Sequence, residues 1–329
     1  MPKQGPPTVN DPACPNTLRR IRKDDLFPER INCLGLAAPA GLISPERYHA
    51  ACRFLTGLGI RLVIGKSVLK GDGLSYVSAP AEDRADDLNE LIRNPEIQAV
   101  YCLRGGYGSV HLLNRVDWTT LRVRNLPVVG YSDITALHAA MEKKQAGTAV
   151  SACMALGLEK DAGNAFFRRN FKRVWDAAGV SHGKFRKIAR LKPCGTRQGP
   201  AEAPLFCGNL TTLASLCGTE YLPVPAGKII FLEDIGEPVR KLDRTLMQLT
   251  LSGFFEGCAG VVFGNFKQCG DPSEREELFA RFAATVSAPV FSGLRFGHCA
   301  GSVSLICGET AVIRDDDLYL RDPFSASRS

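Results

Sequence analysis

The sequence predicts an α/β protein, with an N-terminal, mainly parallel sheet flanked by helices and a smaller C-terminal α/β domain of mixed β structure. Short apolar runs alternate with amphipathic segments along the first half of the 329 residues. The connections between them are short, which favours βα units and a parallel sheet. A chain of this length also favours two domains over one large core.

In the first domain, Pro45 is expected to open a helix, where a missing amide is tolerated, and Gly59 to close it. The other boundaries follow from where apolar runs give way to amphipathic ones. The expected strands cover 31–38, 61–64, 99–103 and 126–129, and the expected helices cover 45–58, 81–93 and 133–144.

Composition divides the chain into four parts. Residues 1–30 are polar and Pro-rich and are expected to form an N-terminal arm, followed by the first domain over 31–158. Lys, Arg and Gly are enriched over 159–200, which we expect to connect this domain to a second one over 201–329, with a weak helical signal at 166–178. In the second domain we expect helices at 208–216, 238–251 and 272–284, strands at 228–232 and 260–263, and short strands over 303–320 around a turn at 315–317.

Charge and cysteine usage exclude several classes of function. The net charge of +7 comes from local basic runs, which are typical of solvated faces, and no basic stripe with interleaved aromatics indicates a nucleic-acid partner. No run approaches the roughly 20 apolar residues of a membrane span, and the polar start argues against a secretory signal, so we expect a cytoplasmic protein. The 12 cysteines form no CxxC pair and there are only five histidines, which predicts reduced thiols and no metal site.

Ser132 is the first candidate for chemistry. It stands in Gly130-Tyr131-Ser132-Asp133, between an apolar run and a predicted helix. A serine on such a sharp turn projects its hydroxyl from the sheet edge, over the positive end of the helix. The local sequence by itself favours a plain helix cap, and the elbow pattern GxSxG is incomplete because Ile134 replaces its second glycine.

The second candidate is the glycine-rich run that starts at Arg104-Gly105-Gly106, directly after a buried strand. Glycines there let the backbone turn tightly and present amides to an anion, as in an oxyanion hole or a phosphate cradle. The dinucleotide pattern GxGxxG fails because His111 stands where its last glycine belongs. A plain turn stays open as a third interpretation.

Two further segments supply an acid and a histidine. Glu233 and Asp234 end a predicted buried strand, where a sheet meets its ligand crevice, although they could also serve the start of the next helix. His298 follows Gly297 in a predicted loop, where catalytic groups often lie, although a lone histidine is more often structural. Together with Ser132 they make a possible triad, since a serine needs a histidine to take its proton and a carboxylate to orient that histidine.

These motifs make the chain similar to the LD-carboxypeptidases, a family of serine peptidases that includes muramoyltetrapeptide carboxypeptidases and the microcin C self-immunity peptidase. The similarity runs from about Ile31 to Leu320. It is carried by AVYCLRGGYGSVHLL (99–113), VVGYSDITALH (128–138), CGNLTTLASLCGT (207–219), IIFLEDIGEPVRKLDRTL (229–246) and RFGHCAG (295–301), and also by LGLAAPAG (34–41) and EDRADDLNELI (82–92).

The resemblance implies a role for each candidate. It implies Ser132 as the nucleophile, Glu233 and His298 as the other two triad members, and the backbone amides of Gly106 and Asp133 as the oxyanion hole. It places the serine in the N-terminal domain and the other two triad residues in the C-terminal domain, with the active site between them. It also implies a homodimer that removes D-alanine from murein tetrapeptides in peptidoglycan recycling, without a metal or organic cofactor.

Several alternatives remain at this stage. The chain could be an immunity peptidase for a peptide–nucleotide adduct, with Trp175 as a candidate to stack on the purine, or a non-catalytic ligand-binding protein. Arg104 could bind the substrate's C-terminal carboxylate through paired, charge-assisted hydrogen bonds, or form an ion pair between domains. One departure from the family pattern puts the substrate pocket in doubt, because Ser151-Ala152-Cys153 stands where the family often has His-Gly-Pro.

Overall fold

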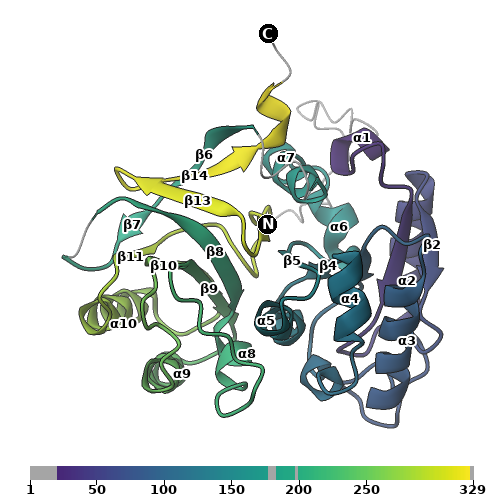
Figure 1. The fold of residues 1–329 in the computed structure, drawn as a ribbon, viewed down its shortest axis with the longest axis horizontal. Helices are drawn as coiled ribbons and strands as arrows, with labels where there is room; N and C mark the ends of the chain where they lie inside the picture. Colours follow the sequence, from purple (N-terminus) through teal and green to yellow (C-terminus); the bar gives the residue numbers. More distant parts are fainter. Residues whose placement is uncertain (1–20, 177–182, 197–198, 327–329) are drawn as a thin grey trace, which may run out of the picture.

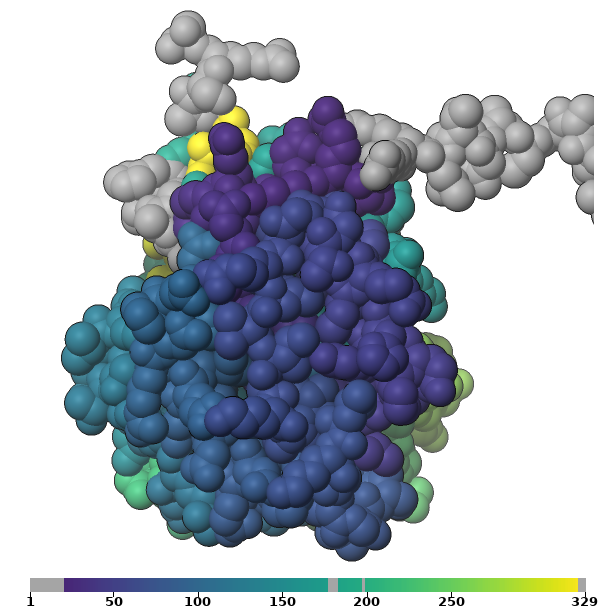
Figure 2. Space-filling model, turned by 90° about the vertical axis from the view of Figure 1, so that its right-hand side faces the viewer, coloured from purple at the N-terminus to yellow at the C-terminus, as the bar shows by residue number. Residues whose placement is uncertain are grey.

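The computed structural model describes residues 21–176, 183–196 and 199–326, and these form two lobes, each built on its own sheet (Figure 1). The expected α/β class is confirmed. The N-terminal part of the chain, purple and blue in Figure 2, covers most of one side of the molecule, so the first lobe is built mainly from consecutive sequence.

The first sheet has the strand order β12-β5-β4-β3-β1-β2 among the described residues. Strands β1 to β5 pair in parallel, and most of their residues are buried because helices cover both faces. Strand β12 comes from the C-terminal part of the chain and pairs with β5 in the antiparallel direction. The strands are β1 (Cys33–Ala37), β2 (Arg61–Ile64), β3 (Val100–Cys102), β4 (Pro127–Gly130), β5 (Thr148–Ser151) and β12 (Leu305–Ile306).

The helices of the first lobe lie close to their predicted positions. Helix α2 starts with Pro45 behind a cap by Ser44, whose Oγ accepts a hydrogen bond from the Arg47 amide at 3.4 Å. Helix α3 has the predicted bounds. The helices are α2 (Pro45–Gly57), α3 (Ala81–Arg93), α4 (Trp118–Arg124), α5 (Thr135–Lys144), α6 (Ala155–Asp161) and α7 (Ala165–Val174).

Part of the predicted N-terminal arm is packed against the first lobe. Residues 1–20 lie outside the described residues, but α1 (Lys23–Leu26) contacts α7, and Leu26 and Phe27 are fully buried. The ring of Phe27 meets those of Phe171 and Trp175 at centroid distances of 5.6 and 4.9 Å. Apolar burial therefore fixes the last residues of this segment to the domain.

The second sheet is mixed, with the order β6-β14-β13-β8-β9-β10-β11-β7. Its centre, β8 to β11, is parallel and the outer strands are antiparallel. Within the described ranges it has eight strands against six in the first sheet, because the expected connecting segment adds β6 and β7. The strands are β6 (Lys184–Arg190), β7 (Lys192–Pro193), β8 (Ala201–Asn209), β9 (Ile229–Ile235), β10 (Gly260–Lys267), β11 (Val290–Ser292), β13 (Thr310–Arg314) and β14 (Asp317–Asp322).

The helices of this lobe are α8 (Leu210–Ala214), α9 (Val239–Leu251) and α10 (Pro272–Thr285). The predicted helix at 208–216 is wrong at its start, because β8 continues to Asn209 and α8 follows. Pro204 and Gly208 hide this strand in the sequence, since both residue types are unfavourable inside strands. The predicted turn near 315–317 is a two-residue hairpin of Asp315 and Asp316, both with positive φ, between β13 and β14.

The two lobes meet where α5 packs on β8 and α8. There the Asn209 amide donates a hydrogen bond to Thr135 Oγ1 at 2.9 Å, and a side chain at Gly208 would collide with Thr135. The segment after β4 in the first sheet is thereby brought next to the ends of β8 and β9 in the second. None of the helices in the described parts of the chain is long and apolar enough to span a membrane.

Candidate active site

Ser132 stands at a strained turn between β4 and α5. It opens the short 3₁₀ helix η2 (Ser132–Ile134) with φ of +64°, a conformation that non-glycine residues rarely adopt and that costs about 1–3 kcal/mol. Neither η2 nor α5 has a side-chain capping hydrogen bond, so the plain helix-cap interpretation is not supported. Strain at this position is typical of a nucleophile elbow.

The glycine-rich loop after β3 lies directly against this serine. A Cβ atom added to Gly105 would come within 2.9 Å of Ser132 Cβ and 3.1 Å of its Oγ. The next residue, Gly106, has φ of +113° and passes equally close to Gly41. Only glycines let the loop approach so closely, and the loop's backbone therefore borders the serine hydroxyl.

Asp133 ties the serine turn to the same loop. Its Oδ2 accepts a hydrogen bond from the Ser109 amide at 2.8 Å, and its carbonyl accepts one from Ser109 Oγ at 2.5 Å. Burial raises the pKa of Asp133, against the opposing effect of hydrogen bonds from Ser109 and Gly108 and the charge of Arg84. The sequence indicated only a role for the Asp133 amide, whereas the side chain holds two segments of the site in register.

Glu233 and His298 form a hydrogen-bonded pair. The distance from His298 Nδ1 to Glu233 Oε2 is 2.6 Å, and the His298 amide donates to the same oxygen at 3.2 Å. Glu233 lies in β9 and is 1% exposed, while His298 lies in the loop after β11. Gly297 allows this contact, because a side chain there would collide with Glu233.

Asp234 faces away from the histidine. Its Oδ2 accepts hydrogen bonds from the amide and hydroxyl of Thr211 at 3.0 and 2.7 Å, so it anchors the start of α8. The other interpretation of the acid pair, as a cap for the helix after Pro238, is not supported because α9 has no side-chain cap. Of the two acids, only Glu233 is hydrogen-bonded to His298 among the described residues.

Asn209 links the two acids, and sequence reasoning missed it. Its Nδ2 donates to Glu233 Oε1 at 3.1 Å and to Asp234 Oδ1 at 3.0 Å, while its Oδ1 caps α8. Burial raises the pKa of Glu233, and the hydrogen bonds from His298 and Asn209 oppose that rise. The signal in the sequence was the asparagine of CGNLTTL, at the end of a strand that was predicted as helix.

The serine and the histidine approach each other through Tyr131, the residue before Ser132. The rings of Tyr131 and His298 are 4.9 Å apart in an edge-on arrangement. Since Nδ1 of His298 faces Glu233, its Nε2 is the nitrogen left for the serine. Among the described residues no hydrogen bond joins Ser132 Oγ to this histidine, and in enzymes generally such catalytic hydrogen bonds tighten when substrate binds.

Both halves of the chain match known domains. Residues 34–151 match the LD-carboxypeptidase N-terminal domain, and residues 202–313 match the LD-carboxypeptidase C-terminal domain. The chain belongs to the LD-carboxypeptidase family. The sequence resemblance is thereby confirmed, and the protein is a peptidase.

Its relatives include proteins named as carboxypeptidases and a protein named for self-immunity. The murein tetrapeptide carboxypeptidase of Pseudomonas aeruginosa is 32% identical over 296 residues, which cover 87% of this chain and 94% of the relative. The probable murein peptide carboxypeptidase of Bacillus subtilis is 28% identical over 288 residues, or 85% and 88% of the two chains. The microcin C7 self-immunity protein MccF of Escherichia coli is 25% identical over 319 residues, or 88% and 91%.

Solved structures show the same fold. Muramoyltetrapeptide carboxypeptidase from Oxalobacter formigenes superposes with a TM-score of 0.71 at 24% identity, covering 88% of this chain and 98% of that chain. MccF in complex with glutamyl sulfamoyl guanosine gives a TM-score of 0.75 at 20% identity, covering 90% and 98%.

Two residues and one segment singled out in the sequence occupy places that refine their interpretation. Arg104 donates from Nη1 to the Leu42 carbonyl at 2.6 Å and forms no ion pair between domains within the described residues. Trp175 is 3% exposed in the core beside Phe27, so this candidate for stacking on a purine is not supported. Ser151-Ala152-Cys153, where the family often has His-Gly-Pro, lines a small cavity beside Tyr131, next to the proposed triad.

Proposed function

We propose that this peptidase is a serine carboxypeptidase that hydrolyses the bond between an L-configured centre and a C-terminal D-alanine of murein tetrapeptides, in peptidoglycan recycling. The observation that carries the proposal is the convergence of three groups from distant segments. Ser132 lies at a strained turn of the first lobe, and the Glu233–His298 pair from the second lobe reaches the adjacent Tyr131.

The arrangement gives each group a step in the reaction. Ser132 Oγ attacks the scissile carbonyl while His298 Nε2 takes the hydroxyl proton, which the histidine later passes to the departing amine. Glu233 accepts a hydrogen bond from Nδ1 and so keeps Nε2 free as the base, and it stabilises the imidazolium that forms. A water then attacks the acyl-enzyme by the same route and releases the shortened peptide.

The oxyanion hole consists of the backbone amides of Gly106 and Asp133. The close packing of Gly105 on Ser132 and the Asp133–Ser109 hydrogen bond support this assignment, because both hold the loop beside the serine. Removing one oxyanion donor typically costs about 100- to 1000-fold in rate, so the geometry of this loop has a large effect on the reaction.

The alternative as an immunity peptidase for peptide–nucleotide adducts has less support from the site. Its expected aromatic, Trp175, is in the core and cannot contact a nucleotide. A purely ligand-binding protein has no need for a buried carboxylate that is hydrogen-bonded to a histidine next to a strained serine. We propose a cytoplasmic location because the proposed role is in peptidoglycan recycling. We also propose a homodimer, which the family resemblance implies.

The direct test is incubation with a purified murein tetrapeptide that ends in D-alanine, with free D-alanine measured over time. A peptidyl-sulfamoyl adenosine serves as the competing substrate. Release of D-alanine by the wild type but not by a Ser132→Ala variant supports the proposal. Cleavage of the adenosine adduct alone would move the protein to the immunity class.

A further inference from the structure

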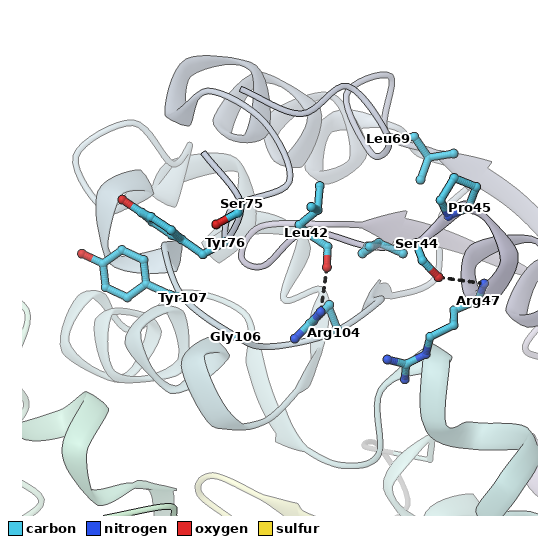
Figure 3. A pocket seen from close by; sticks show the side chains of 11 residues that line it. Leu42, Ser44, Pro45, Arg47, Leu69, Ser75, Tyr76, Arg104, Gly106 and Tyr107 are labelled. Carbon is cyan, nitrogen blue, oxygen red and sulfur yellow. Dashed lines mark hydrogen bonds between the residues drawn. The ribbon is translucent and has the colours of Figure 1, made fainter. Parts of the chain in front are cut away.

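A large pocket opens beside the glycine-rich loop of the proposed oxyanion hole. It has a volume of about 770 Å³, and Gly106 belongs to its wall (Figure 3). The other lining residues come from the same glycine-rich loop, from the loop before α2, from the start of α2, and from the segment before α3. They include two arginines, Arg47 and Arg104, but no aspartate or glutamate.

The two arginines have no carboxylate partner among the described residues. Arg104 is half-buried and oriented by its hydrogen bond to the Leu42 carbonyl, which leaves most of its N–H groups free. Its pKa is lowered by burial and, secondarily, by the like charge of Arg47. Two neighbouring guanidinium groups without an acid make the pocket attractive to an anion, and guanidinium binds a carboxylate through paired hydrogen bonds.

The remaining wall of the pocket is mainly apolar, with two serines, Ser44 and Ser75. Four large hydrophobic side chains that are exposed to solvent line it: Leu42, Leu69, Tyr76 and Tyr107. The two tyrosine rings meet edge to face at a centroid distance of 5.6 Å. Exposed apolar side chains gathered around a few charged groups are typical of a small-ligand site.

The position of the pocket indicates which part of a substrate enters it. In an exopeptidase the terminal carboxylate lies next to the scissile bond, and Arg104 directly precedes the glycines that border Ser132. In the view of Figure 3, Arg104 lies between the tyrosine pair on one side and Arg47 on the other. A carboxylate held there leaves room beside the tyrosines for the side chain of the same residue.

We propose that this pocket binds the departing C-terminal residue, with Arg47 and Arg104 together holding its carboxylate and the apolar wall accepting side chains larger than the methyl group of alanine. The inference rests on the proposed carboxypeptidase function and extends it. It makes Arg47 a second determinant of exopeptidase specificity. It also predicts that peptides ending in D-methionine or D-phenylalanine are substrates.

The first experiment measures kcat/KM for a tetrapeptide ending in D-alanine and for its C-terminal amide. Loss of a charge-assisted contact in Arg47→Ala or Arg104→Ala should lower kcat/KM for the acid about ten- to a hundredfold, and leave the amide nearly unchanged. Because both groups bind one carboxylate, the double variant should lose less than the product of the two single effects. Arg53→Ala, an exposed arginine of the same helix α2 but outside the pocket, is the matched control and should behave as wild type.

The second experiment tests the apolar wall by binding as well as turnover. Free D-phenylalanine should inhibit release of D-alanine at lower concentration than free D-alanine, D-phenylalaninamide should inhibit poorly, and Arg47→Ala should weaken the inhibition by D-phenylalanine. Tetrapeptides ending in D-methionine and D-phenylalanine should be cleaved with kcat/KM within about tenfold of the D-alanine peptide, as expected of a pocket that accepts extra methylenes.

The outcomes separate this inference from the proposed function. If the wild type releases D-alanine but Arg47→Ala cleaves acid and amide in the wild-type ratio, Arg47 does not hold the carboxylate and the inference is overturned while the function stands. Rejection of the D-phenylalanine peptide together with no inhibition by D-phenylalanine refutes the apolar part. Absence of any Ser132-dependent D-alanine release refutes the function itself.

Discussion

Glu233 and Asp234 are adjacent acids with different hydrogen-bond partners. We predict that the amide substitution removes activity at Glu233 and mainly lowers stability at Asp234. Glu233 Oε2 receives the Nδ1 proton of His298 at 2.6 Å, whereas both Asp234 oxygens accept hydrogen bonds from Thr211, Asn209 and Ile235. Glu233→Gln should therefore remove activity. Asp234→Asn should keep most activity and lose stability.

The magnitude for Glu233→Gln follows from the hydrogen bond it changes. A glutamine amide can donate to Nδ1, which moves the histidine proton to Nε2 and abolishes its role as base. The corresponding change in the serine protease triad lowers kcat by about 10⁴, equivalent to about 5.4 kcal/mol of transition-state stabilisation. Asp234→Asn places an amide donor opposite existing donors, which costs about 1–3 kcal/mol of folding free energy.

The raised pKa of Glu233 also predicts how the stability of Glu233→Gln, relative to wild type, changes with pH. Burial raises the pKa of Glu233, so the folded protein binds this proton more tightly than the unfolded chain. Stability then falls as pH rises from the unfolded value of about 4.3 through the raised pKa, and the loss persists at neutral pH. Glutamine does not titrate, and its amide group meets the Asn209 or His298 donor at every pH. The melting temperature of the variant relative to wild type should therefore be higher at pH 7 than near pH 4.

The assay combines release of D-alanine with thermal melting of both variants at several pH values. An active Glu233→Gln together with an inactive, normally stable Asp234→Asn would show that Asp234, and not Glu233, is the triad acid. A melting temperature of Glu233→Gln that falls relative to wild type between pH 4 and pH 7 would show that the ionised carboxylate stabilises the fold, against the reasoning from burial.

Three further predictions concern the serine, its loop and metals. Ser132→Ala should fold as wild type and retain less than about a thousandth of the rate, and a higher residual rate means that another residue is the nucleophile. Gly105→Ala should reduce kcat/KM by about 100-fold or more, because the added Cβ would lie 2.9 Å from Ser132 Cβ and displace the proposed oxyanion hole. The control is Gly163→Ala, where the added Cβ meets no atom within 4 Å. Chelators should leave activity unchanged, since serine, histidine and glutamate need no metal, and loss of activity in EDTA that zinc restores would contradict the mechanism.

The sequence by itself determined the class of fold and most of its elements. The alternation of apolar runs with amphipathic segments predicted the parallel sheet and the bounds of α3 and α2 to within a residue or two, because local periodicity decides these features. It missed β8, whose Pro204 and Gly208 are unfavourable for a strand until neighbouring strands supply hydrogen bonds. It also could not show that β12 crosses into the first sheet.

For the site, the sequence supplied the candidates but not their geometry. The motifs singled out Ser132, Glu233 and His298, but the sequence permitted either Glu233 or Asp234 to face the histidine. Which of them does so was decided by the register of β9 beside β8 and by the Gly297 loop, which packs on the Glu233 face.

Tertiary structure alone decided the contacts between distant segments. Asn209, which joins the two acids, and Arg47, which enters the pocket of Arg104, carry no local signal because their partners lie in other strands and loops. Trp175 had the chemistry to bind a base, but packing against Phe27 placed it in the core. Residue type and spacing thus determined what chemistry was available, while burial and side-chain direction, which depend on the whole packed chain, determined which residues the chemistry reaches.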